Sequence, residues 1–78
     1  MNPRHIITYM LNKSGNSRSG ISVKMGRSRN FLNSTIFNKS TPRVDTVVAV
    51  ADLCGFDVVI VPRGSKLPKE AIKVDPME

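Results

Sequence analysis

Apolar residues recur every three or four positions through residues 1–55, a spacing that predicts amphipathic helices. Four helices are expected, over residues 3–13, 18–25, 29–37 and 42–54. Asn2 and Pro3 suit the cap and the first turn of the first helix. Thr41 and Pro42 suit the start of the fourth helix, and Gly55 suits its end. The chain is therefore expected to be mainly α.

The fourth expected helix is rich in valine, so β structure competes with helix there. The capping residues and the helical spacing favour the helix. Its buried stripe is expected to hold the apolar residues that share this spacing, namely Val44, Val47, Val48, Ala51 and Cys54, widened by Val50 and Leu53. The cysteine is then a core thiol and not a nucleophile.

After Gly55 the pattern changes to a short β-branched run, which predicts one strand over residues 56–61. A lone strand has no partner within the chain, so we expect it to pair with the same strand of a second copy, or, as the alternative, in a hairpin with residues 73–75. The dimerisation residues would be Phe56, Val58, Val59, Ile60 and Val61. Residues 1–62 would form the domain and residues 63–78 a polar tail, with room for a short helical turn at 68–73.

A chain of 78 residues is expected to form one small domain with a marginal core, which also favours a dimer. No apolar run approaches the ~20 residues of a membrane span. One cysteine excludes an intrachain disulfide, and the single histidine and cysteine do not suggest a metal site. A reducing cytoplasm fits. We see no nucleophile–base pair and no phosphate loop, so neither an enzyme nor a cofactor is expected.

The net charge of +6 is unevenly distributed. Residues 1–44 hold eight lysines and arginines and no acid, whereas residues 45–78 hold four bases and six acids. Carboxylates close to a phosphate backbone oppose binding, so an acid-free half favours a nucleic-acid partner. The alternative is a solvated basic surface with no specific partner.

The acid-free half also contains a pattern typical of two helices joined by a tight turn. Gly26 is the natural corner, and Ser28 is a good N-cap for the helix that follows. Phe31 and Leu32 would lie on the buried side of that helix. Its exposed side would carry hydrogen-bonding residues, namely Arg29, Asn30, Asn33 and Ser34. Arginine pairs well with guanine and asparagine with adenine, although an ordinary amphipathic helix is the alternative.

The segment from Ile21 to Leu53 resembles the Xre/Cro/repressor family of small helix-turn-helix transcription regulators. The matching features are the run Met25-Gly26-Arg27-Ser28, Leu32 at the family's buried position in the recognition helix, and Thr41-Pro42 before a helix that ends at Gly55. Together they cover roughly residues 3–55. Two features depart from the family: Thr35 replaces its usual aliphatic residue, and a strand follows Gly55, as in smaller Cro-like proteins and HipB-like antitoxins.

The resemblance implies a lambda-repressor-like domain of four to five helices followed by the C-terminal strand. It implies that Ser28 caps the recognition helix and that Arg29, Asn30 and Asn33 touch base edges, with Ser34 beside them. Residues near phosphates at the ends of the motif would be Arg18, Arg27, Ser28, Asn38, Lys39 and Arg43. Such contacts position the protein, whereas base contacts specify the sequence.

We therefore expect a homodimeric, repressor-like regulator of bacterial or phage type that binds double-stranded DNA. Its recognition helices, at about residues 29–37, would enter successive major grooves. The alternative is an antitoxin or a phage-encoded inhibitor that binds a protein partner through its strand and tail.

Overall fold

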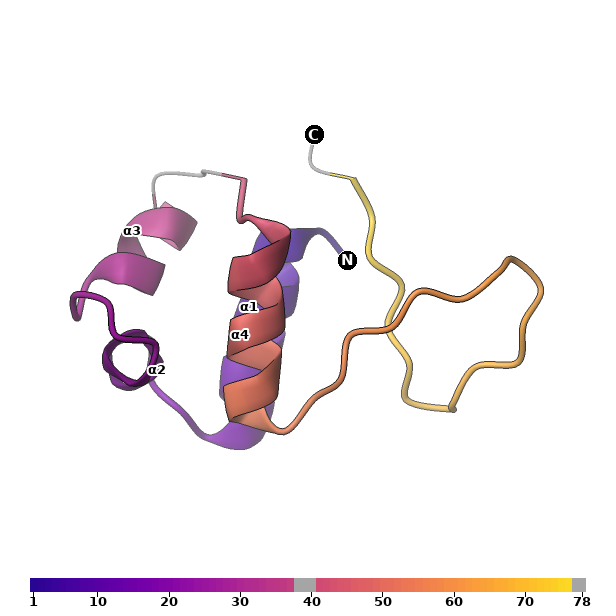
Figure 1. Ribbon diagram of the computed structural model, residues 1–78, viewed down its shortest axis with the longest axis horizontal. Coiled ribbons are helices and arrows are strands. Elements are labelled where there is room, and N and C mark those ends of the chain that lie inside the picture. Colours follow the sequence, from indigo (N-terminus) through magenta and orange to yellow (C-terminus); the bar gives the residue numbers. More distant parts are fainter. Residues whose placement is uncertain (38–40, 77–78) are drawn as a thin grey trace.

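The computed structural model describes residues 1–37 and 41–76, and it confirms the expected mainly helical class (Figure 1). Its helices are α1 (Pro3–Ser14), α2 (Arg18–Lys24), α3 (Phe31–Phe37) and α4 (Val44–Cys54). Within the described ranges there is no strand. Over the same ranges, every helix is too short or too polar to cross a lipid bilayer.

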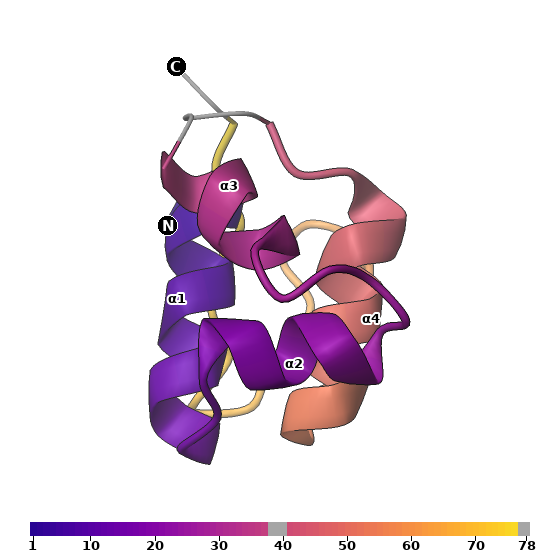
Figure 2. The ribbon, with the colours of Figure 1, turned by 90° about the vertical axis from the view of Figure 1, so that its left-hand side faces the viewer.

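The helices form two layers. In Figures 1 and 2, α1 and α4 lie side by side and run in the same direction, α2 runs across them, and α3 packs on α2. The core between the layers is apolar and draws on every helix, through Ile6, Ile7, Met10, Leu11, Ile21, Leu32, Val50 and Ala51. The pair α1–α4 therefore supplies the platform that carries α2 and α3.

Helix α1 matches the local signals in its sequence. The Asn2 side chain accepts a hydrogen bond from the His5 N–H at 3.0 Å, and Pro3 occupies the first helical position. This bond satisfies one of the amides that the first turn of a helix leaves open. The apolar spacing then turns one continuous stripe towards α4 and the second layer.

Helix α4 begins two residues later than the sequence predicted. It starts at Val44, and its N-cap residue, Arg43, makes no side-chain cap hydrogen bond. Pro42 precedes the helix, and its side chain is buried. The expectation that Thr41 caps this helix was wrong. In the first turn the Asp45 carboxylate itself accepts the Thr46 N–H at 2.9 Å, so this open amide needs no upstream hydroxyl.

The buried side of α4 was only partly predicted. Val50 and Ala51 are fully buried, and Val47 and Cys54 pack against the core. Val44 is 77% exposed, and Val48 and Leu53 are also exposed. The helix carries more apolar positions than one face can bury, and the contact with α1 selects the face.

The predicted strand over residues 56–61 was wrong. Phe56 instead closes the end of α4: its N–H donates to the Ala51 carbonyl at 2.8 Å, and its ring meets that of Tyr9 edge-on, with centroids 6.2 Å apart. Residues 57–61 then run exposed along the surface, and Ile60 is 98% exposed. A strand needs a backbone partner, and no backbone hydrogen bond joins residues 57–61 to another segment of the described chain.

The predicted alternative hairpin was also wrong, because residues 73–75 return to the N-terminus instead. The Asp75 N–H donates to the Met1 carbonyl at 2.9 Å, and the Met1 amine contacts the Lys73 carbonyl and the Asp75 carboxylate. This amine, by hydrogen bond and charge, holds the pKa of the Asp75 carboxyl below its usual value. Residues 57–76 thus form a wide exposed loop tied at its far end (Figure 1).

This tie leads to a pH prediction. Because the Asp75 pKa is lowered in the folded chain, the tie is present above the ordinary carboxyl pKa and is lost as the pH falls through the lowered value. Asp75→Asn should release the segment at neutral pH and shift the NMR resonances of Met1 and Lys73, while the melting of the helices stays unchanged. Asp57→Asn, the same change elsewhere in the exposed loop, should leave these resonances in place. Unshifted resonances in Asp75→Asn would show that the tie does not form in solution.

Candidate nucleic-acid interface

Helices α2 and α3 meet across a turn whose geometry follows from Gly26. This glycine has φ of 75°, in the left-handed region that residues with a Cβ rarely adopt. Its N–H donates to the Val23 carbonyl at 2.9 Å, and the Arg27 N–H donates to the Ser22 carbonyl at 3.0 Å. This pair of bonds is a Schellman motif, which ends α2 and redirects the chain. The glycine corner expected from the sequence is therefore present.

Ser22 fixes α3 against α2. Its side chain is fully buried, and its hydroxyl donates to the Arg18 carbonyl at 2.7 Å and accepts the Leu32 N–H at 3.1 Å. The Leu32 amide is one of those that the first turn of α3 leaves open, so α2 caps α3 through a side chain. Next to it, the Leu32 side chain is fully buried in the core.

The start of α3 differs from the prediction. The helix begins at Phe31 and not at residue 29, after a turn in which the Phe31 N–H donates to the Ser28 carbonyl at 3.1 Å. Within the described chain no hydrogen bond of the Ser28 hydroxyl is present, so its predicted role as a cap was wrong. The physical reason is that the open Leu32 N–H in the first turn of α3 already donates to the Ser22 hydroxyl, so it needs no acceptor from Ser28.

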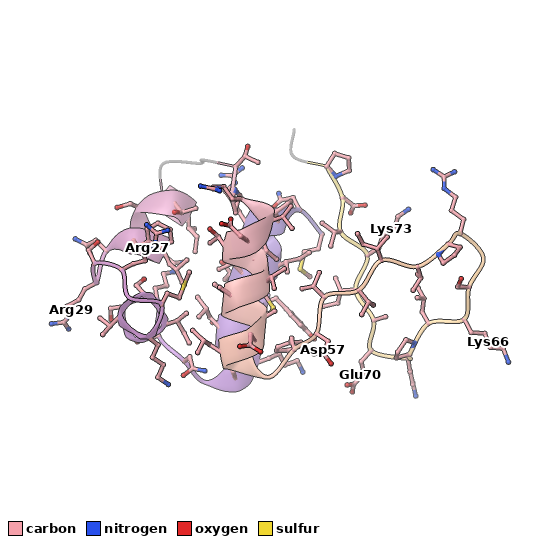
Figure 3. All side chains as sticks on the ribbon, in the orientation of Figure 1. Arg27, Arg29, Asp57, Lys66, Glu70 and Lys73 are labelled. Carbon is pink, nitrogen blue, oxygen red and sulfur yellow. The ribbon has the colours of Figure 1, made fainter. Side chains whose placement is uncertain are left out.

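The four predicted base-reading residues are all exposed. Arg29 and Asn30 lie in the turn before α3, and Asn33 and Ser34 lie on α3 itself. Figure 3 shows Arg29 pointing away from the body of the protein at the end formed by α2 and α3. The turn and α3 therefore place all four hydrogen-bonding side chains on the outer surface of the two-helix unit that α2 and α3 form.

The predicted phosphate-contacting residues differ in what surrounds them. Arg18 is half-buried and donates through Nη1 to Asn33 Oδ1 at 3.0 Å, and the Arg27 guanidinium lies 4.9 Å from the centre of the Phe31 ring. Arg43 lies 3.3 Å from the Asp45 carboxylate, with both side chains exposed. Ser28 is exposed in the turn. The predictions for Asn38 and Lys39 fall outside the described residues.

One cation was missed by the sequence interpretation. Lys24 lines two shallow depressions: one of about 640 Å³ beside Ser17, Ser19 and Arg29, and one of about 320 Å³ between the end of α2 and α4. Lys24 is the last residue of α2, where a cation suits the helix dipole. Because this position already accounts for a lysine, nothing in the sequence indicated that Lys24 lies beside Arg29.

Helices α2 and α3 and the turn between them carry no acid, since none precedes Asp45 in the chain, whereas Asp45 and Asp52 of α4 line the depression beside Lys24 and Arg27. Asp57 and Glu70 lie on the other side of α4 from α2 and α3, in the exposed loop (Figure 3). Within residues 1–37 and 41–76, no three histidine, cysteine or acidic side chains are grouped so that they could hold a metal ion. The surface is therefore built for hydrogen bonds and for anions.

Comparisons of this chain with protein-family models, with curated proteins and with solved structures found no match.

The role of Ser22 can be tested through stability. Ser22→Ala leaves the buried Leu32 N–H without an acceptor and should lower the free energy of unfolding by about 1–3 kcal/mol, measured by urea denaturation. Ser19→Ala makes the same chemical change in the same helix, where the hydroxyl has no hydrogen bond within the described chain. It should change this free energy by less than about 0.5 kcal/mol. Equal effects of the two substitutions would contradict the capping role.

Proposed function

We propose that this chain is a sequence-specific double-stranded DNA-binding protein that acts as a repressor-like transcriptional regulator. The observation that carries the proposal is the two-helix unit: a buried serine and a glycine turn hold α3 so that Arg29, Asn30, Asn33 and Ser34 are exposed together. A short helix held across a second helix is the arrangement by which helix-turn-helix proteins enter a major groove. A bacterial or phage regulator of this kind would work in the cytoplasm, beside its DNA.

The contacts would divide by chemistry. Arg29 and Asn30, at the N-terminal side of α3, would reach base edges first, because the start of a recognition helix lies deepest in the groove. Arg27, Ser28 and Lys24 would lie near phosphates and fix the register of the protein on the duplex. Arg43 would contribute least, because Asp45 already partly neutralises its charge.

A homodimer is part of this proposal. Two recognition helices would occupy successive major grooves about 34 Å apart. Support comes from the apolar side chains of residues 58–61, all of them exposed, with Val59 at 72% and Ile60 at 98%. Monomeric proteins rarely leave such a contiguous apolar run in water. The same run supports the second candidate function, a module that binds a different protein partner.

The base contacts can be tested on duplexes selected from a random library. Arg29→Ala and Asn30→Ala should each weaken binding to the selected site by about 1–3 kcal/mol and leave binding to random duplexes nearly unchanged, as measured by gel shift at two salt concentrations. Lys66→Ala removes a cation from the exposed loop at the other end of the molecule and is the control (Figure 3). It should bind the selected site like the parent.

Two results would contradict the regulator. One is that Arg29→Ala and Asn30→Ala bind the selected site as tightly as the parent. The other is that selection enriches no motif and binding stays weak and uniform while a protein partner co-purifies, which would favour the interaction module.

The homodimer can be tested by sedimentation equilibrium. Ile60→Lys places a charge in the exposed apolar run and should weaken self-association at least about tenfold, because burying an unpaired charge is costly. Val44→Lys makes a similar change at a valine that is 77% exposed on α4 and should leave self-association unchanged. A parent chain that stays monomeric both free and on its selected duplex would rule the dimer out.

A further inference from the structure

Phe31, the first residue of α3, contacts more than the core. Its side chain is half-buried and packs against the apolar core. Arg27 also lies over its ring, with the guanidinium carbon 4.9 Å from the ring centre. This distance is within the range of a cation–π interaction. The sequence placed Phe31 only on the buried side of α3, whereas the structure gives the same ring an exposed cation as a second partner.

The Arg27 side chain is exposed, but it is held at both ends. At its root, the Arg27 N–H donates to the Ser22 carbonyl at 3.0 Å in the turn that follows α2. At its tip, the guanidinium lies over a ring whose backbone is itself fixed, because the Phe31 N–H donates to the Ser28 carbonyl at 3.1 Å. An arginine has many rotamers, and one that is already ordered loses less conformational freedom when it binds. The guanidinium is therefore placed before any ligand arrives.

The contact with the ring leaves the hydrogen-bond donors of Arg27 free. An aromatic ring attracts the charge of a guanidinium but offers no oxygen to its N–H groups. In the part of the chain that the structure describes, the Arg27 side chain makes no hydrogen bond and no ion pair. Arg18 and Arg43 differ, because each already has an acceptor on a neighbouring side chain. A phosphate, whose oxygens match the planar fork of a guanidinium, suits an arginine held in this way.

The acids nearest to Arg27 do not take the place of this ligand. Asp45 and Asp52 of α4 line the same depression of about 320 Å³ as Arg27. Among the described residues neither acid pairs with Arg27, and the Asp45 carboxylate lies 3.3 Å from Arg43 instead. A carboxylate partner would partly cancel the charge that attracts a phosphate, whereas a ring holds the guanidinium and leaves its charge intact. Phe31 therefore holds Arg27 in a way that favours the binding of an anion.

We propose that Phe31 is a positioning residue for DNA binding: it holds the Arg27 guanidinium so that the free N–H groups donate to one phosphate of the duplex backbone. The inference rests on the proposed function, in which Arg27 lies near phosphates. It goes further because it makes the contribution of Arg27 depend on an aromatic residue that itself need not touch DNA. Phosphate contacts carry no sequence information, so this pair contributes to the affinity for every duplex and not to the choice of sequence.

The pair can be tested by a double-mutant cycle in binding to random-sequence duplexes, measured at several salt concentrations. Arg27→Ala should weaken binding and reduce the slope of log K against log salt by about 0.9, because one phosphate contact is lost. Phe31→Leu removes the ring and keeps an apolar side chain against the core. In the Phe31→Leu chain, Arg27→Ala should cost about 2- to 5-fold less affinity than in the parent. Phe31→Tyr keeps the ring and should behave like the parent.

Lys24→Ala is the matched control. Lys24 is an exposed cation that lines the same depression as Arg27, but within the described chain it makes no contact of this kind with an aromatic ring. Its substitution should weaken binding by the same factor in the parent and in the Phe31→Leu chain, because the effects of residues that share no contact add. Urea denaturation checks that each variant is folded, and Phe31→Met replaces Phe31→Leu if the smaller side chain unfolds α3.

The outcomes separate this inference from the proposed function. If Arg27→Ala costs the same in the parent and in Phe31→Leu, or if Phe31→Tyr loses as much affinity as Phe31→Leu, the positioning role is overturned while DNA binding stands. If Arg27→Ala weakens binding to the selected site and leaves random duplexes unchanged, Arg27 reads a base and the phosphate assignment is overturned. If the parent binds no duplex, the proposed function fails and this inference fails with it.

Discussion

The hydroxyl of Ser22 is the interaction on which the outer half of this molecule depends. Helix α3 has seven residues, too few to be stable in water without packing or caps. It gains both from α2 and the core: Ser22 accepts the Leu32 amide, and the Leu32 side chain is buried beside it. The same hydroxyl donates to the Arg18 carbonyl, so α2 and α3 share one buried polar atom. Every exposed group on α3 takes its direction from this link.

The rotation of α3 about its axis follows from the same contacts. The sequence left that rotation open, because Thr35 stands where a buried aliphatic residue is usual. Thr35 is half-buried, and its hydroxyl donates to the Phe31 carbonyl at 3.0 Å, so a polar side chain there leaves no unpaired group. With Leu32 fixing the inner side, Asn33 and Ser34 must point outward. The predicted exposed face is therefore present even though the helix begins two residues late.

The features that the sequence predicted well are those with local causes. Asn2 and Pro3 define the start of α1 because cap and ring act within one turn, and Gly26 and Gly55 end helices by their own backbone conformation. The features that were wrong depend on distant partners. Residues 56–61 have strand-like composition but pair with no other strand in the described chain, and the buried face of α4 is selected by α1. The Ser22–Leu32 bond also escaped prediction, because a small residue in a helix gives no sign of which amide it will meet.

The same distinction holds for the candidate site. Composition shows how many charged residues the site can hold, but not which other residues they contact. The acid-free composition of residues 1–44 predicted a cationic surface, but it could not show that three of its arginines are already engaged: Arg18 with Asn33, Arg27 with Phe31, and Arg43 with Asp45. Each engagement changes what the group can offer a ligand. A guanidinium over an aromatic ring keeps its full charge. A guanidinium beside a carboxylate is partly neutralised. A guanidinium that donates to an amide oxygen sets which end of that amide faces it. Specificity on this surface would thus depend on contacts between its own residues as much as on their identities.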